Sequence, residues 1–378
     1  MFAAEMERRG IMSLNLLVIN PGSTSTKVAF YKDEHQEFLE VVTHPSSELA
    51  QYKQIFDQYE FRKAIIYQTL ERRNVDLKSI AAVVGRGGLC KPIPSGVYEI
   101  NEQMIADLKT SAFGKHVSSL SGLIAHEMAK EIGVKAYIVD PVVVNEFEPL
   151  AFYSGWPEIK RKSLFHALNQ KAAARKAAAQ LGKSYESLRL IVAHLGGGIT
   201  IGVHKYGRVV DVNNGLEEGP FAPERTGSLP IGDLIRLCFA DRFQKDEMLR
   251  TMAGKGGLVA YLGTNDGKEV EQRICAGDSY AAEVFEAMAY QVAKEIGSAA
   301  AVLEGKVDAV ILTGGLAGSE RFVGWVRQRV EFIAGIIVFP GEFEMEALAA
   351  GAWRVLSGRE EAKTYAPTED WSHYMGFN

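Results

Sequence analysis

Apolar runs separated by short glycine-rich loops recur along the 378-residue chain. The first run, "LLVI" (16–19), enters the polar loop "NPGSTST" (20–26), and a second run, "KVAFY" (27–31), leaves it. Short runs rich in Val and aromatic residues on both sides of a Pro-Gly-Ser cluster are typical of two strands joined by a turn. The start of the chain is therefore predicted to form a strand, a polar turn and a second strand.

The same arrangement returns in "LIVAHLGGGITIGVHKYG" (190–207), and a third glycine-rich turn, "TGGLAGSE" (313–320), follows the apolar run 309–312. Further strands are predicted at 81–85 and 135–140, and helices at 118–133, at 165–181 and in the Ala/Leu-rich segment that follows residue 342. Two strand–turn–strand units predict two related halves connected by helices. The sequence has no short-period repeat, which argues against a solenoid or a propeller.

Composition and charge narrow the class of protein. The chain is 47% hydrophobic and 24% charged, with a net charge of −5 and a pI near 6.0, which is ordinary for a globular protein of two domains and gives no whole-chain basicity for a nucleic-acid partner. Cys90, Cys238 and Cys275 form no CxxC pair and are predicted to be thiols in a reducing compartment. No apolar run approaches the ~18 residues of a membrane span, so we expect no membrane partner and a cytoplasmic location.

The glycine-rich turns are candidate phosphate sites. Consecutive backbone N–H groups in a tight turn bind anions, and glycine lets phosphate oxygens approach the main chain. Ser and Thr hydroxyls and the Lys27 ammonium add donors to the first turn. The simpler alternative is a set of hairpins in which glycine serves the turn alone. Neither the Gly-x-x-x-x-Gly-Lys-Ser/Thr loop nor a Gly-x-Gly-x-x-Gly helix start after the first strand is present.

Several motifs carry a resemblance to known proteins. "INPGSTSTK" (19–27), "AHLGGGIT" (193–200) and "LTGGLAGS" (312–319) resemble the phosphate-1, phosphate-2 and adenosine motifs of the actin/Hsp70/sugar-kinase superfamily. Four longer segments resemble the acetate/butyrate kinase family, and its butyrate kinase branch most of all. They are "VVGRGGLCKPIPSGVYEI" (83–100), "KSLFHALNQKAAAR" (162–175), "NNGLEEGPFAPERTGSLP" (213–230) and "GEFEMEALAAG" (341–351). The resemblance extends over most of the chain.

The resemblance implies a fold and a reaction. The expected fold class is α/β, a two-domain duplicated ribonuclease H-like (actin-like ATPase) fold with an interdomain ATP cleft. The N-terminal domain is expected at 12–155, joined by a C-terminal helix at 345–378, and the C-terminal domain at 156–344. The expected reaction converts ATP and butyrate, or a branched short-chain fatty acid, to ADP and the acyl phosphate, with Mg²⁺ as cofactor. A homo-oligomer, dimer or larger, is also expected.

The chemistry of this reaction makes particular demands on the site. A carboxylic acid is already ionised at pH 7, so the nucleophile needs no strong base, and the problem is the approach of two anions. By the resemblance, Arg86 meets the substrate carboxylate, Arg225 clamps the transferring phosphoryl group and His166 donates a hydrogen bond to one of its oxygens. Asp140 is expected to orient a metal or a water molecule.

The resemblance also assigns residues to ATP, metal and substrate. ATP is expected to contact Asn20, Ser23, Ser25, Lys27, His194, Gly196, Gly197, Gly198, Gly314, Gly315 and Gly318. The metal is assigned to Asn20 and Glu346, although Glu342 and Glu344 are close enough to confuse the register. Gly87, Gly88, His116 and Phe165 are expected to line the substrate. The two glycines stand where acetate kinases have a bulky apolar pair, which predicts room for a four- or five-carbon acid. The alternative is that they serve only a tight loop.

Two other functions stay open from the sequence. One is an acetate or propionate kinase, and the other is a non-catalytic nucleotide-binding switch of the same superfamily. A switch does not need two arginines and a histidine at the γ-phosphate, and a sugar kinase would be expected to use an aspartate base on a neutral hydroxyl. The three residues Arg86, Arg225 and His166 therefore favour a carboxylate kinase.

Overall fold

The computed structural model describes residues 14–110, 117–240 and 242–366. These residues form two compact units. The first contains the chain up to Val144 and the segment that starts at Phe343, and the second contains Asn145–Glu342. The first unit is therefore built from both ends of the chain, whereas the second is continuous.

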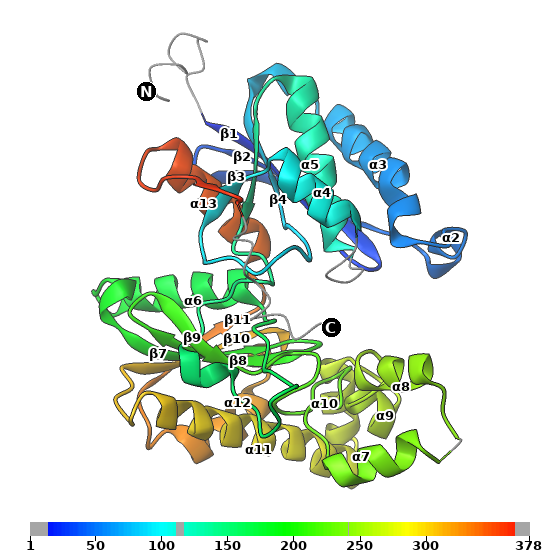
Figure 1. Cartoon of the computed structure of the whole chain (residues 1–378), viewed down its shortest axis with the longest axis vertical. Helices are drawn as coiled ribbons and strands as arrows, with labels where there is room; N and C mark the ends of the chain where they lie inside the picture. Colours follow the sequence, from blue (N-terminus) through cyan, green and yellow to red (C-terminus); the bar gives the residue numbers. More distant parts are fainter. Residues whose placement is uncertain (1–13, 111–116, 241, 367–378) are drawn as a thin grey trace. The chain divides into compact units, whose positions relative to one another are not determined.

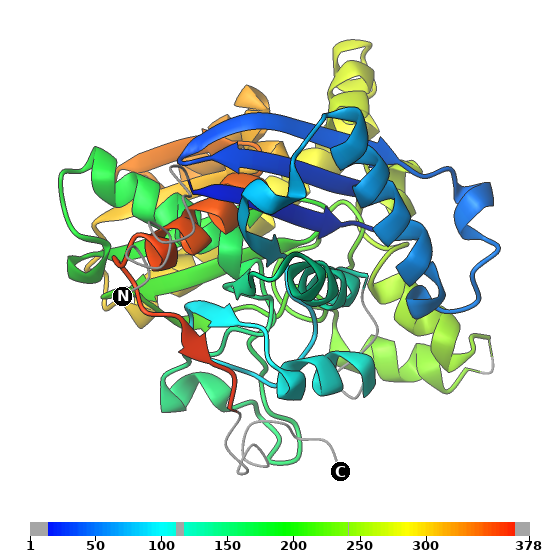
Figure 2. The ribbon, with the colours of Figure 1, turned by 90° about the horizontal axis from the view of Figure 1, so that it is seen from above.

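The first unit is a seven-stranded sheet covered by helices (Figure 1). Its strands are β1 (Asn15–Pro21), β2 (Ser25–Lys32), β3 (His35–Thr43), β4 (Ile80–Gly85), β5 (Val97–Glu99), β6 (Lys135–Val139) and β12 (Lys363–Thr364). Its helices are α2 (Ser46–Leu49), α3 (Tyr59–Arg72), α4 (Glu102–Thr110), α5 (Ser118–Ile132) and α13 (Glu344–Leu356), with 3₁₀ turns η1 (Ile55–Gln58) and η2 (Leu77–Ser79). Both α5 and α13 pack on β1, β4 and β6. Figure 2 shows β1, β2 and β3 side by side in dark blue.

The register of the first sheet brings three of the predicted site residues to one edge. Strands β1, β4 and β6 are parallel neighbours in which Ile19 pairs with Gly85, and Gly85 with Ile138. Asn20 is at the end of β1, Arg86 follows β4 and Asp140 follows β6. Ligands of open α/β sheets bind at the carboxyl ends of the parallel strands, and all three residues lie at that edge.

The second unit has a five-stranded sheet between two helical layers. Its strands are β7 (Arg189–Leu195), β8 (Ile199–Lys205), β9 (Arg208–Val212), β10 (Ala309–Gly314) and β11 (Ile336–Pro340). Its helices are α6 (Ala167–Gln180), α7 (Ile231–Cys238), α8 (Lys245–Met252), α9 (Leu258–Leu262), α10 (Gly267–Cys275), α11 (Ser279–Val302) and α12 (Glu320–Val330). The 3₁₀ turns are η3 (Pro149–Phe152), η4 (Tyr185–Ser187) and η5 (Gly315–Gly318).

The two sheets repeat one topology. The first contains the order β3-β2-β1-β4-β6 and the second has β9-β8-β7-β10-β11. In each, the first three strands of the unit form an antiparallel meander. Two further strands then add in parallel beside the first strand, β4 and β6 in the first sheet and β10 and β11 in the second. This repetition confirms the predicted duplicated α/β fold. Among the described helices, none is long and apolar enough to cross a membrane.

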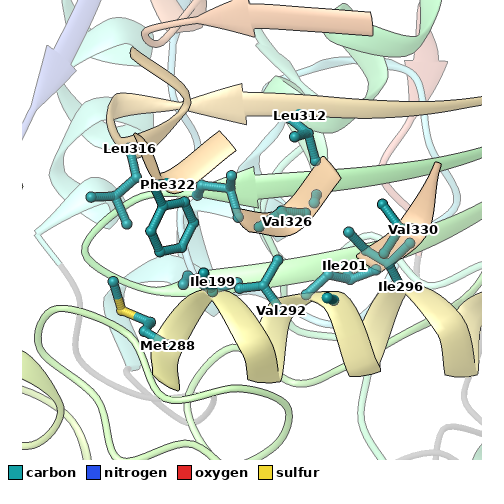
Figure 3. Close-up of a cluster of buried hydrophobic side chains, with 14 of the residues drawn as sticks. Ile199, Ile201, Met288, Val292, Ile296, Leu312, Leu316, Phe322, Val326 and Val330 are labelled. Carbon is teal, nitrogen blue, oxygen red and sulfur yellow. The ribbon is translucent and has the colours of Figure 1, made fainter. Parts of the chain in front are cut away.

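Alternating residues of the second sheet separate its two apolar layers. Side chains at successive positions of a strand point to opposite faces. Ile191 and Leu195 in β7 therefore join the cluster of α11 and α12, whereas Leu190 and Val192 pack with the alanines of α6. Figure 3 shows the first cluster, in which Phe322 of α12 lies among side chains of α11 and the sheet. Small alanines on α6 allow that helix to pack closely on the sheet.

We expect Phe322→Ala to destabilise the second unit by about 3–5 kcal/mol, because it removes a completely buried ring from a close-packed cluster. Phe332→Ala is the matched control, since that ring is 83% exposed. Thermal unfolding of both variants checks the prediction. Equal midpoints for the two variants would contradict the assignment of Phe322 to this core.

Candidate active site

In the first unit, four polar side chains from four segments meet at the carboxyl end of the sheet. The carboxylate of Glu344, the first residue of α13, is their common partner. Asn20 Nδ2 donates to Glu344 Oε2 at 2.7 Å, and Arg86 Nε donates to Oε1 at 3.2 Å. Lys27 Nζ, in β2, lies 3.7 Å from Oε2. One carboxylate thus orients residues from the first glycine-containing loop and from the end of β4.

Glu344 is held in its ionised form. Burial alone would raise its pKa, but the charges of Arg86 and Lys27 and the hydrogen bonds from Arg86 and Asn20 hold the pKa of this carboxyl below its usual value. The Asn20 amide is oriented at the same time. Because its NH₂ donates to Glu344, its carbonyl oxygen Oδ1 is the atom that remains for a cation or for water.

Arg86 offers unused hydrogen-bonding capacity in a buried place. Its side chain is 7% exposed, and Glu344 accepts from Nε. Among the described residues, Nη1 of Arg86 is buried without a hydrogen-bond partner. An unmet buried donor costs about 1–3 kcal/mol, and more when it is charged. This geometry suits an anion that accepts from the outer end of the guanidinium.

Arg62 of α3 donates hydrogen bonds to the first loop, and it was not predicted from the sequence. Its Nη1 donates to Ser25 O at 2.8 Å and to Thr26 Oγ1 at 3.0 Å, and its Nη2 donates to Ser23 O at 3.3 Å. The residue is completely buried, and burial lowers the pKa of Arg62 to about 10. It therefore stays protonated at neutral pH. Nothing in the helical sequence around Arg62 distinguishes it from a surface arginine.

The turn between β1 and β2, to which Arg62 donates, is tight, and its tip is exposed to solvent. Gly22 N donates to Ser25 O at 2.8 Å, and Pro21 pairs with Thr26 across the hairpin. Ser23 is exposed and Ser25 is half-buried. The loop carbonyls of Ser23 and Ser25 are occupied by Arg62, so the exposed tip keeps its hydroxyl donors for a ligand.

Asp140 lies at the same sheet edge in an unusual backbone conformation. Its φ is +39°, a region that non-glycine residues adopt at a cost and often at functional sites. Its Oδ1 accepts from Ser95 Oγ at 2.6 Å and from Gly96 N at 2.9 Å. The side chain is buried, with 1% of the residue exposed. These contacts fix the loop after Pro94 against the end of β6.

The glycines that follow Arg86 are explained by packing, as the tight-loop alternative expects. Gly87 has a φ of +75°, in the left-handed region that favours glycine. A Cβ on Gly88 would lie 2.4 Å from the Cα of Ser119 in α5. Both glycines are buried, and their missing side chains make room for a neighbouring helix and strand. Phe165 is likewise buried, and His116 lies outside the described residues.

In the second unit, the turn Gly196–Gly198 between β7 and β8 lies against Arg225. A Cβ on Gly198 would be 2.2 Å from Arg225 Nη1, so only glycine admits the guanidinium here. Nη1 donates to Gly215 O, and the N–H of Glu224 donates to Gly197 O at 3.1 Å. Burial lowers the pKa of Arg225, and the neighbouring Glu224 charge opposes that shift. The structure therefore brings this predicted arginine and this predicted turn together.

His166 and His194 are also adjacent. His166 is the N-cap residue of α6, and His194 is buried near the end of β7. Their rings stack with centroids 4.1 Å apart and planes 22° apart. His166 Nδ1 lies 3.0 Å from Thr200 Oγ1, at the start of β8. The two histidines and the Gly196–Gly198 turn thus form one end of the second sheet.

The third glycine turn divides into a buried and an exposed part. Gly314 has a φ of +96°, and a Cβ there would lie 2.5 Å from Leu195 O, so this glycine allows two backbones to approach. Gly315 and Gly318 in η5 are exposed. Ser319 then caps α12 by accepting from Phe322 N. The exposed part of the turn is therefore the part that suits a ligand.

The glutamate that contacts Asn20 is Glu344, two residues before the predicted metal ligand Glu346. Glu346 and Glu342 are exposed, whereas Glu344 contacts Asn20. Within the described part of the chain, no group of three or more His, Cys, Asp and Glu side chains forms a metal cluster. A divalent cation here would have Asn20 Oδ1, Glu344 and ligand phosphates as oxygen donors, which suits Mg²⁺ because Mg²⁺ binds few protein ligands and keeps several waters.

Comparison with known proteins places this geometry in a family. The profile of the Acetokinase family matches residues 156–338. The chain is 54% identical over 355 residues to Butyrate kinase 2 of Clostridium acetobutylicum, which covers 94% of this chain and all of that protein.

Solved structures show the same fold. An acetate kinase of Porphyromonas gingivalis superimposes with a TM-score of 0.74 at 21% identity and covers 91% of this chain and 100% of that one. A propionate kinase of Francisella tularensis gives 0.69 at 19% identity and covers 89% and 98%. The fold is that of the duplicated actin-like ATPases. The chain belongs to the acetokinase family.

We expect Arg62→Met to lower the stability of the first unit by about 2–4 kcal/mol, because three acceptors of the first loop lose their buried donor. The variant should also raise the KM for ATP. Arg72→Met on the same helix is the control, because the Arg72 side chain is 60% exposed and its loss should cost less than 1 kcal/mol. Thermal unfolding and steady-state kinetics check both. An unchanged KM in a folded Arg62→Met protein would contradict a role for Arg62 in shaping the loop.

Proposed function

We propose that the protein is a butyrate kinase, which transfers the γ-phosphoryl group of ATP directly to butyrate or a branched short-chain carboxylate. The products are ADP and an acyl phosphate. The observation that carries the proposal is the buried guanidinium of Arg86, whose Nη1 has no partner among the described residues. The name of the 54% identical relative supports butyrate as the substrate. An acetate or propionate kinase stays the alternative.

The first unit supplies charges that suit a carboxylate meeting a phosphate. The substrate carboxylate would accept from the outer nitrogens of Arg86, and Glu344 holds that guanidinium in place through Nε. Lys27 adds a second positive charge, and the exposed first loop adds hydroxyl donors. A positioned cation offsets the repulsion between two anions in a site that excludes water, and it does so without reorganisation. This arrangement needs no general base.

The second unit supplies groups that suit the transferring phosphoryl group. We assign Arg225 to its equatorial oxygens, because the guanidinium lies on the Gly196–Gly198 turn. His166 would donate a hydrogen bond to the same group, and His194 would support its ring by stacking. Gly315 and Gly318 would lie against the nucleoside. An arginine in such a role can contribute 10³-fold or more to the rate.

Mg²⁺ is the proposed metal. When bound, it would neutralise phosphate charge, and Asn20 and Glu344 are the residues that would hold it through oxygen or through its waters. Asp140, fixed by Ser95 and Gly96, would orient one of those waters. We also propose the cytoplasm as the place of the reaction, because ATP is the donor there. A homo-oligomer, dimer or larger, stays a prediction.

We expect the protein to form acyl hydroxamate when it is incubated with ATP, Mg²⁺, hydroxylamine and a short carboxylate. A profile over straight and branched C2–C6 acids should give the highest kcat/KM for a four- or five-carbon acid. Arg86→Met and Arg225→Met should each lower kcat/KM by about 10³-fold while the proteins stay folded. Arg359→Met is the control, since that side chain is 65% exposed. A protein that traps no hydroxamate with any of these acids would overturn the proposed function.

We expect Glu344→Gln to raise the Mg²⁺ concentration for half-maximal activity by ~10-fold or more, because Asn20 and Arg86 lose their charged partner. Glu346→Gln, which changes an exposed residue two positions later, should stay within about twofold of the natural protein. Titration of activity with Mg²⁺ at saturating ATP separates the two. A larger effect at Glu346 than at Glu344 would restore the assignment predicted from the sequence.

A further inference from the structure

Behind His166, a chain of buried polar side chains runs into the second unit. Thr200 Oγ1 lies 3.0 Å from His166 Nδ1, and Gln170 Nε2 lies 2.9 Å from Thr200 Oγ1. Gln170 Oε1 is 3.1 Å from His204 Nε2, and His204 Nδ1 is 2.7 Å from the Tyr185 hydroxyl. Thr200, Gln170 and His204 are completely buried. No part of the proposed phosphoryl transfer uses these four residues directly.

The backbone carbonyl of Thr200 sets the direction of this series of hydrogen bonds. Gln170 Nε2 also lies 3.0 Å from the carbonyl oxygen of Thr200. A carbonyl oxygen can only accept, so the NH₂ of Gln170 must face Thr200 and its Oε1 must face His204. Both protons of that NH₂ are then used, one on the Thr200 carbonyl and one on the Thr200 hydroxyl oxygen. The orientation of the Gln170 amide is therefore not interchangeable.

The Thr200 hydroxyl determines which partner donates in its hydrogen bond with His166. Its oxygen accepts from Gln170, so its own proton needs an acceptor. Across the described residues, His166 Nδ1 is the acceptor within reach of that proton. With Nδ1 accepting, a neutral imidazole carries its proton on Nε2.

The inner end of the chain is fixed in the same sense. Gln170 Oε1 accepts from His204 Nε2, so Nδ1 of a neutral His204 accepts from the Tyr185 hydroxyl. Burial, with the charges of Lys171 and Arg175, holds the pKa of His204 well below its usual value, so the ring is neutral. Every link from Tyr185 to His166 therefore donates in one direction, toward the site.

A glycine in β8 keeps space for the Gln170 amide. A Cβ on Gly202 would lie 2.1 Å from Gln170 Oε1 and 3.2 Å from His204 Nε2. An alanine at this position would displace the amide from Thr200. Gly202 thus offers a way to disturb the chain without changing any polar group in it.

We propose that Thr200 and Gln170 are positioning residues that hold His166 as its Nε2–H tautomer, with the ring oriented to donate from Nε2. The proposal rests on the proposed role of His166 toward the phosphoryl group. A donor of fixed direction loses no energy to reorientation when charge develops on the phosphoryl oxygens. The opposite tautomer would present a lone pair to an anion instead of a proton.

The direct test is the protonation of the two ring nitrogens of His166, and it does not depend on activity. In the natural protein labelled with ¹⁵N-histidine, long-range ¹H–¹⁵N spectra distinguish a protonated from an unprotonated nitrogen, and the signals absent from His166→Gln identify the residue. We expect an unprotonated Nδ1 and a protonated Nε2 at neutral pH. A neutral ring with its proton on Nδ1, or a ring protonated on both nitrogens, would overturn the proposal even if the enzyme is fully active.

The variants separate positioning from packing. Thr200→Val keeps the shape and removes the hydroxyl, so kcat should fall about 10- to 100-fold while the KM values for ATP and butyrate stay within about threefold. Thr200→Ser restores the hydroxyl and should recover most of kcat. Gly202→Ala should lower kcat in the same way as Thr200→Val.

Val203→Ala, one residue further along β8, removes a buried side chain and is the control for lost packing. It should lower the unfolding midpoint and leave both kcat and the His166 spectrum unchanged. If Thr200→Val does not fold, Gly202→Ala and the spectrum of the natural protein still decide the question. A kcat of Thr200→Val within twofold of the natural value, or failure of Thr200→Ser to recover kcat, would refute the positioning role. Absence of kinase activity together with the expected tautomer would refute the proposed function instead.

Discussion

The first unit depends on the placing of one negative charge among several positive ones. Glu344 draws the amide of Asn20, the guanidinium of Arg86 and the ammonium of Lys27 to a single carboxylate. A buried ion cluster of this kind adds little stability, since the Coulomb gain is largely offset by desolvation. What it supplies is orientation. With the carboxylate in place, the Asn20 carbonyl oxygen and the outer edge of Arg86 are left for a ligand, and one of the two positive charges is offset.

The second unit achieves the same control of direction without a central charge. Arg225 is held by the carbonyl oxygen of Gly215 and by the absence of a side chain at Gly198, and His166 is held by the Thr200 hydroxyl, whose proton points toward His166 Nδ1. The hydrogen-bond acceptor of the Arg225 side chain, Gly215 O, is neutral, and Glu224 is its charged neighbour. The two units therefore present different environments. The first centres on one carboxylate between two cations, and the second on an arginine and a histidine held by a backbone carbonyl and a hydroxyl.

The sequence predicted the duplicated fold and most of the residues that meet at the sheet ends, because these features leave local signals. A polar turn between two apolar runs is visible in the letters, and so is an arginine that follows a buried strand. Arg62, Gln170 and Thr200 could not be identified in this way, since their importance comes from which residues the tertiary fold sets opposite them. Glu344 was within the predicted segment, but three glutamates at alternate positions carry no mark of which one α13 turns inward. The Gly87–Gly88 pair kept two interpretations, because a missing side chain looks the same in a sequence whether it makes room for a ligand or for Ser119.

The construction of the first unit from both ends of the chain has a consequence for biosynthesis. Domains generally fold as units while the chain emerges from its N-terminus. Strands β1 to β6 of the first unit are made early, but Glu344 and the rest of α13 arrive only after the continuous second unit has been made. Until then, Asn20 and Arg86 have no carboxylate to orient them, and the face of β1, β4 and β6 that α13 covers is bare. A nascent or truncated chain that lacks α13 is thus left without this carboxylate, so the first unit holds Asn20 and Arg86 in place only after the second unit has been made.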